Sequence, residues 1–166
     1  MSGLATAATE CIRHRVLIVD DQRDMRELLR MRLGFADDMD VIGEASNGLE
    51  AIAMCRTLRP DAAVLDLEMP VVRGDQAIPM MRAAAHGIRI LMYSGSSRAT
   101  LDALTGGDAG PDHFLKKECS LNELVTQLRA VLNADRVYRG SQGVLEWRHR
   151  EIVRAIAAIV TASASR

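Results

Sequence analysis

The sequence predicts a doubly wound α/β fold, a parallel sheet with helices on both faces. Short apolar runs alternate with helical patterns five times along the chain. Capping boxes, Asn47 to Glu50 and Ser120 to Glu123, mark the starts of two helices. Because crossovers between parallel strands are right-handed, all five strands should end on one edge of the sheet.

Each expected element has its own local pattern. The strands are short apolar runs, expected at residues 15–19, 39–45, 62–66, 88–93 and 113–115. The helices have apolar residues at helical spacing and are expected at 25–33, 47–59, 77–85, 99–104 and 121–132. Gly34 should stop the first helix, and Pro79 should lie in the first turn of the third helix or kink it.

Composition limits the classes of protein that fit. The 166 residues suit one domain with a short appendage, and the 48% of hydrophobic residues are enough for a core. A net charge of −1 gives no whole-chain signal for binding nucleic acid or an acidic membrane. Cys11, Cys55 and Cys119 lack metal-ligand spacing, and no signal peptide or membrane span is evident. We therefore expect a soluble cytoplasmic protein with reduced thiols.

Polar side chains follow four of the five expected strands. Asp20 and Asp21 follow the first strand, Asp66 the third, Ser94 the fourth and Lys117 the fifth. At one sheet edge, three carboxylates need a cation, and an all-oxygen site with room for water and phosphate suits Mg²⁺. Lys117 and Ser94 could then bind further phosphoryl oxygens. Asp66, in the middle of the sheet, is the natural nucleophile.

These residues resemble the receiver domain of two-component response regulators. The resemblance covers about residues 14–134 and rests on four motifs in order. They are Asp20-Asp21 after an apolar run, Asp66-Leu67-Glu68-Met69-Pro70 with Gly74 eight residues after the Asp, Ser94, and Phe114-Leu115-Lys116-Lys117. The family implies a flavodoxin-like sheet of strand order 2-1-3-4-5 with five helices, to which this chain adds one C-terminal helix.

The resemblance also implies roles for the residues at the sheet edge. Asp66 is the expected phosphoacceptor, which takes a phosphoryl group from a histidine kinase or a phosphotransfer protein. The expected Mg²⁺ ligands are Asp20, Asp21, Asp66 and the backbone carbonyl of Glu68, with Asp21 a more direct ligand than Asp20. The protein would assist its own phosphorylation and dephosphorylation without being a turnover enzyme.

The remaining roles concern the response to phosphorylation. Ser94 should bond a phosphoryl oxygen and Lys117 should pair with the phosphorylated site. Lys117 is expected in preference to Lys116 because it lies three residues after Phe114. Ser94 and Phe114 form the expected switch that changes binding of a downstream protein target.

Three residues depart from the family pattern. Glu118 stands where a proline in a cis bond often follows the lysine, and Tyr93 stands where an aliphatic residue is more usual. Glu68 places a further acid two residues past Asp66, beside the route of attacking water. We expect Glu68 to tune the lifetime of the phosphorylated state, in a direction that the sequence does not reveal.

Two other classes of protein share some of these features. A haloacid dehalogenase-type phosphatase also uses a strand-end Asp, Mg²⁺ and a lysine, but it requires a second Asp where this chain has Glu68. A transcription regulator is suggested by residues 145–154, which are similar to the first helix of a helix-turn-helix effector. No second, recognition helix is present, so we expect a remnant or a coincidence and no DNA binding.

The chain outside the receiver divides into three further segments. Residues 1–13 are expected to form a flexible tail, 135–145 a polar linker and 146–166 a helix. Ile152, Ile156, Ile159 and Val160 lie along one side of this expected helix. The apolar stripe predicts a dimerisation or partner-binding element, with a homodimer favoured over packing against its own receiver.

Overall fold

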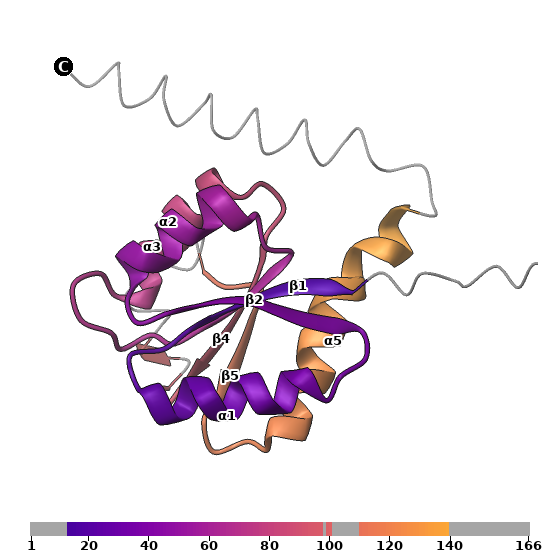
Figure 1. The fold of residues 1–166 in the computed structure, drawn as a ribbon, viewed down its shortest axis with the longest axis horizontal. Coiled ribbons are helices and arrows are strands. Elements are labelled where there is room, and N and C mark those ends of the chain that lie inside the picture. Colours follow the sequence, from indigo (N-terminus) through magenta and orange to yellow (C-terminus); the bar gives the residue numbers. More distant parts are fainter. Residues whose placement is uncertain (1–12, 98, 101–109, 140–166) are drawn as a thin grey trace, which may run out of the picture. The chain divides into compact units, whose positions relative to one another are not determined.

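The described part of the chain is built around a five-stranded parallel sheet (Figure 1). The computed structural model describes residues 13–97, 99–100 and 110–139. The strands are β1 His14–Val19, β2 Met39–Ala45, β3 Ala62–Leu65, β4 Arg89–Ser94 and β5 His113–Lys116. All pair in parallel in the order β2-β1-β3-β4-β5, which confirms the predicted class and strand order.

Four helices connect and follow these strands in the described residues. They are α1 Arg23–Gly34, α2 Gly48–Leu58, α3 Gly74–Ala84 and α5 Leu121–Arg139. The helix expected at 99–104 lies largely outside the described residues, although positions 99 and 100 are helical. The C-terminal helix expected at 146–166 lies wholly outside them. None of the described helices is long and apolar enough to cross a membrane.

Among the described residues, each face of the sheet is covered by its own pair of helices. Figure 1 shows α2 and α3 on one side of the sheet and α1 and α5 on the other. Buried aliphatic side chains such as Leu65 and Ile78 fill the first layer, and Ile18 and Leu128 belong to the second. Burial of these aliphatic side chains stabilises the packing of helices on both faces of the sheet. The packed sheet in turn fixes the positions of the strand ends.

The N-cap hydrogen bond of each predicted capping box is present at the start of α2 and of α5, although the reciprocal bond to the N-cap N–H is not seen in either. The Asn47 side chain accepts a hydrogen bond from the Glu50 backbone N–H at 3.0 Å. The Glu50 carboxylate bonds back to the N–H of Ser46, at 2.8 Å, and not to that of Asn47. At α5, the Ser120 hydroxyl accepts from the Glu123 N–H at 3.2 Å. Both caps satisfy backbone donors that the first helical turn leaves unpaired.

Helix α3 starts three residues earlier than the apolar pattern predicted. It begins at Gly74, whose N–H donates to the carbonyl of Leu67 at 3.0 Å. Pro79 is therefore the sixth residue of the helix and lies in its second turn, not its first. The sequence pattern missed this start because the early residues are polar and are placed by contact with the chain after β3.

Candidate functional site

Asp20 and Asp66 lie side by side because β1 and β3 are in register. Val19 is paired with Leu65, so the next residue of each strand emerges at the same point of the sheet edge. Asp20 is 1% exposed and Asp66 is 5% exposed, whereas Asp21 faces solvent. One carboxylate oxygen from each of the three residues lies within 4.8 Å of the other two. The topology thus gathers the predicted acids into one cluster.

Lys117 provides the cation that the described residues place against this cluster. Its Nζ atom lies 2.7 Å from Asp20 Oδ2 and 2.8 Å from Asp66 Oδ2, donating a hydrogen bond to each. Lys116 is exposed and forms a long ion pair with Glu118, at 3.9 Å. Of the two neighbouring lysines, Lys117 is therefore the one that reaches the carboxylates.

Burial and pairing act in opposite directions on these groups. Burial raises the pKa of Asp20, and the hydrogen bond from Lys117 only partly offsets this effect. Burial alone would lower the pKa of Lys117, but its hydrogen bonds to Asp20 and Asp66 outweigh it and raise the pKa. Lys117 consequently stays charged at neutral pH. A single ammonium then faces three acids, which leaves the cluster with an excess of negative charge.

Backbone amides orient the two buried carboxylates. Asp66 Oδ1 accepts from the N–H of Leu67 at 2.7 Å, with a longer contact of 3.5 Å to the N–H of Glu68. Asp20 Oδ1 accepts from the N–H of Gln22 at 2.9 Å. Since each carboxylate is also held by Lys117 through its other oxygen, neither is free to rotate without breaking a hydrogen bond.

Gly74 allows helix α3 to approach the backbone of Asp66. A Cβ atom at position 74 would lie 2.1 Å from the Asp66 carbonyl oxygen, well inside van der Waals contact. The need for a glycine here is thus steric, since no side chain fits against this carbonyl. Close contact between α3 and the chain after β3 fixes where Asp66 sits.

Ser94 and Phe114 lie on the strands next to this cluster. Ser94 ends β4, is 1% exposed, and accepts a hydrogen bond from the Ser96 N–H at 3.3 Å. Phe114 is half-buried in β5 and packs against the layer of α2 and α3. The Ser96 hydroxyl donates to the Glu68 carboxylate, which joins the loop after β4 to the loop after β3.

Arg26 braces the acidic turn and was not predicted from the sequence. Its Nη1 atom donates to the carbonyl of Asp20 at 2.8 Å and to that of Asp21 at 3.2 Å. Its Nε atom lies 3.6 Å from Glu44 on β2. The sequence signal that could have predicted this contact is a cation in the first turn of the helix that follows the acid pair. The same pattern also fits an arginine on a solvated helix face.

The donor atoms of the cluster fit a hard divalent cation. All are carboxylate oxygens, the exposed Asp21 leaves an approach from solvent, and the negative charge exceeds that of Lys117. Mg²⁺ prefers such oxygen ligands and keeps several of its waters. The cluster is therefore consistent with a Mg²⁺ site.

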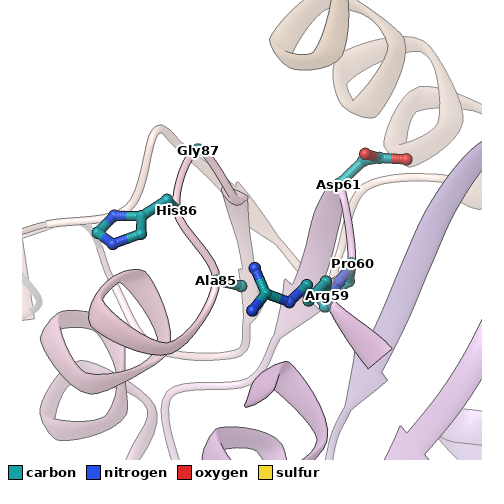
Figure 2. Close-up of a pocket in the computed structure, with 6 residues that line it drawn as sticks. All are labelled: Arg59, Pro60, Asp61, Ala85, His86 and Gly87. Carbon is teal, nitrogen blue, oxygen red and sulfur yellow. The ribbon is translucent and has the colours of Figure 1, made fainter. Parts of the chain in front are cut away.

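A separate shallow hollow lies at the opposite edge of the sheet. It has a volume of about 120 Å³ and is lined by the loops before β3 and β4. Figure 2 shows the Arg59 side chain extending toward Ala85, while His86 and Asp61 point away. These loops precede β3 and β4, whereas Asp66 follows the far end of β3, so the hollow is not part of the acidic site.

Comparison with known proteins assigns this arrangement to a family. The model of the response regulator receiver domain matches residues 16–129. The chain belongs to this family. The receiver is 36% identical over 118 residues to the response regulator MprA of Mycobacterium ulcerans, covering 71% of this chain and 50% of that protein. It is 34% identical to a protein-glutamate methylesterase/protein-glutamine glutaminase of Methanococcoides burtonii, covering 73% of this chain and 36% of that protein.

Solved receiver structures superpose on most of the chain. The response regulator domain of Thermotoga maritima CheB matches with a TM-score of 0.64 and 30% identity, covering 73% of this chain and 97% of that one. The receiver domain of the putative response regulator NarL from Mycobacterium tuberculosis has a TM-score of 0.68 and 26% identity, covering 74% and 98%. This chain spans about half the length of MprA, which therefore contains further sequence outside the matched region.

Proposed function

We propose that this receiver accepts a phosphoryl group on Asp66 from a histidine kinase or a phosphotransfer protein, and thereby changes its binding to a downstream protein. The observation that carries the proposal is the position of the Asp66 carboxylate. It lies at the centre of the sheet edge, clustered with the carboxylates of Asp20 and Asp21 and hydrogen-bonded to the ammonium of Lys117.

The chemistry follows from the groups around Asp66. One of its carboxylate oxygens forms a bond to phosphorus while the bond from phosphorus to the donor imidazole nitrogen breaks, leaving the electron pair on that nitrogen. Lys117 already bonds Asp66 Oδ2, so its charge is in place to balance the incoming phosphoryl group. Asp20, Asp21, Asp66 and the Glu68 carbonyl would hold Mg²⁺, whose chemistry here is to offset phosphoryl charge.

The response would begin at the neighbouring strand ends. A phosphoryl group adds about −1.5 to −2 charge and new hydrogen-bond acceptors beside the buried Ser94 hydroxyl. Attraction of Ser94 and Lys117 toward the modified Asp66 would free space into which the half-buried Phe114 side chain would reorient. The output would be a change in partner binding on the face formed by β4, β5 and their helices, without turnover of a separate substrate.

The decisive test is chemical phosphorylation with a small donor. Acetyl phosphate or phosphoramidate with Mg²⁺ should add one acid-labile phosphoryl group, read promptly by intact mass, and EDTA should suppress the addition. Asp66→Asn should abolish it. Asp40→Asn, an exposed Asp on β2, is the matched control and should be labelled like wild type. Undiminished labelling of Asp66→Asn would overturn the assignment. A phosphotransfer profile against the host's purified histidine kinases would identify the donor.

A further inference from the structure

Tyr93 of β4 links the core of the receiver to the turn that carries Lys117. Its side chain belongs to the layer packed under α1 and α5, and the residue is 3% exposed. Its hydroxyl lies 3.3 Å from the Lys117 carbonyl oxygen and 3.3 Å from that of Cys119. A phenol has one proton to donate, so the two equal and rather long distances describe a hydrogen bond shared between both carbonyls.

Two backbone hydrogen bonds also hold the turn from Lys117 to Cys119. The N–H of Lys117 donates to the Ser94 carbonyl at 3.0 Å, and the N–H of Cys119 donates to the Lys116 carbonyl at 2.9 Å. Glu118 is exposed and supplies no fixed φ of the kind that a proline would impose. The Tyr93 hydroxyl therefore adds a rigid, buried side-chain donor to a turn that is also held by these two backbone hydrogen bonds and by the packing of Cys119 against the core.

The position of this turn decides where the Lys117 ammonium can reach. Its Nζ atom must lie within hydrogen-bond distance of Asp20 and Asp66 at the same time, at 2.7 and 2.8 Å. A lysine side chain has four flexible bonds, so its anchor must be fixed for both contacts to be populated together. A backbone shift of about 1 Å would require the side chain to change its torsions, which lowers the population of the geometry in which both contacts form.

We propose that Tyr93 is a positioning residue for Lys117, and that its hydroxyl holds the 117–119 turn so that the ammonium bridges Asp20 and Asp66. Tyr93 acts through Lys117 and does not itself touch the reacting atoms. The inference rests on the proposed function, because it assigns Lys117 a role in phosphorylation of Asp66. It gives a function to a residue that would otherwise serve only as part of the core.

Tyr93→Phe tests the proposal because it retains the ring and removes only the hydroxyl. The rate of phosphorylation by phosphoramidate with Mg²⁺ should fall about three- to tenfold, the size of effect expected from losing one neutral hydrogen bond. Thr126→Val is the matched control, because it deletes a hydroxyl-to-carbonyl bond of 3.0 Å on α5, and should leave the rate unchanged. An unchanged rate in Tyr93→Phe would overturn the proposal.

Titration with MgCl₂ alone, followed by amide NMR, separates positioning from general loosening of the fold. An ammonium that leaves the carboxylates repels Mg²⁺ less and frees oxygen ligands, so Tyr93→Phe should bind Mg²⁺ about twofold more tightly while being phosphorylated more slowly. In a Lys117→Ala background the same substitution should have no effect on Mg²⁺ affinity. Equal effects in both backgrounds, or weaker Mg²⁺ binding, would show a structural role for Tyr93 and overturn the proposal.

The outcome for wild type distinguishes the two levels of inference. If wild type is not labelled on Asp66, the proposed function fails and the role of Tyr93 fails with it. If wild type is labelled and Tyr93→Phe behaves identically in rate and Mg²⁺ affinity, the proposed function stands and the role of Tyr93 alone is wrong.

Discussion

At the scale of single residues, Asp66 is held from two directions. The amide of Leu67 bonds one carboxylate oxygen, and Lys117 bonds the other. Neither contact involves Ser94, whose hydroxyl accepts from the N–H of Ser96. Acceptance of a phosphoryl group and the response to it can therefore depend on different side chains.

Ser94→Ala should separate these two steps. We expect it to be labelled on Asp66 by a small phosphodonor, because the acids and Lys117 remain, but to respond weakly to the modification. Amide spectra with and without beryllofluoride measure the response at positions 93–97 and 110–118. A change as complete as that of wild type would show that the Ser94 hydroxyl does not couple the site to β5.

Gly74→Ala should destabilise the receiver by about 1–3 kcal/mol or more, since the added methyl group would overlap the Asp66 carbonyl oxygen. Gly34→Ala is its control. Apart from its chain neighbours and the backbone of its own helix, no atom of the described residues lies within 4 Å of a Cβ built at position 34 in helix α1, so this change should be neutral or stabilising by up to about 1 kcal/mol. Urea unfolding measures both. Equal stabilities of the two variants would contradict the close approach of α3.

At the scale of elements, helix α1 presents apolar residues on its outer side. Leu28, Met31 and Phe35 recur at helical spacing at the end of α1 and are 47%, 58% and 79% exposed. The inner side packs through Leu29 and Leu33. An exposed apolar stripe of this kind suits contact with another protein, and α1 begins directly after the acidic turn. A phosphodonor protein that docked on this stripe would lie next to the acidic turn.

Phe35→Ser should slow phosphotransfer from the cognate protein donor about tenfold, the loss typical of a contact residue in a protein interface. Its labelling by acetyl phosphate should match that of wild type, because the change lies outside the acidic site. Leu49→Ser on α2, where Leu49 is 58% exposed, is the control and should not slow transfer. If Phe35→Ser transfers at the wild-type rate, the donor docks elsewhere.

Arg129 of α5 ties that helix to the loop before β2. Its Nε and Nη2 atoms donate to the two carboxylate oxygens of Asp38 at 2.8 and 2.7 Å. The hydrogen bond from Arg129 lowers the pKa of Asp38, because it favours the ionised form. The contribution to stability is therefore present above the unfolded pKa of about 3.9, and is lost as the pH falls through the lower folded value.

Asp38→Asn should consequently lower the free energy of unfolding at pH 7 by about 0.5 kcal/mol, a small value because both side chains are a third or more exposed and screened by solvent. Urea unfolding at several pH values should show the deficit shrink toward acid pH. High salt should also reduce it. A deficit that grows as the pH falls would have the wrong sign for this ion pair.

At the scale of the whole molecule, the chain continues beyond the receiver match, which ends at residue 129. The apolar stripe expected in 146–166 lies outside the described residues. Leaving such side chains in water forgoes about 1.5–3 kcal/mol each, so a partner surface is needed. We propose that the segment forms a homodimer contact, either helix to helix or as an exchanged arm.

Light scattering after size exclusion tests this proposal on the full chain and on a chain ending at Gly140. The full chain should be a dimer and the shorter chain a monomer that is still labelled by acetyl phosphate. Monomers in both cases would remove the dimer and favour packing of the segment on its own receiver. A dimer that survives truncation would move the interface to the receiver itself.

Local sequence patterns were sufficient to predict the strands, the polar side chains that follow them and the N-caps of α2 and α5. Patterns such as an apolar run that ends in an acid, or Asn47 three residues before Glu50, involve only a few neighbouring positions. The resemblance to a family added the strand order, which the sheet confirms. The helix expected at 99–104 and the C-terminal helix remain predictions, because they fall largely or wholly outside the described residues.

The contacts that make the site were decided by the tertiary structure. Lys117 bonds acids 97 and 51 positions away, which requires the register of β1 against β3 and the placement of the turn after β5. Tyr93 differs from other core residues because its hydroxyl donates to a carbonyl of that turn. Position 74 must be glycine because a Cβ atom there would overlap the carbonyl oxygen of Asp66. These contacts join distant segments, so they depend on how the strands and helices pack, which no short stretch of sequence encodes.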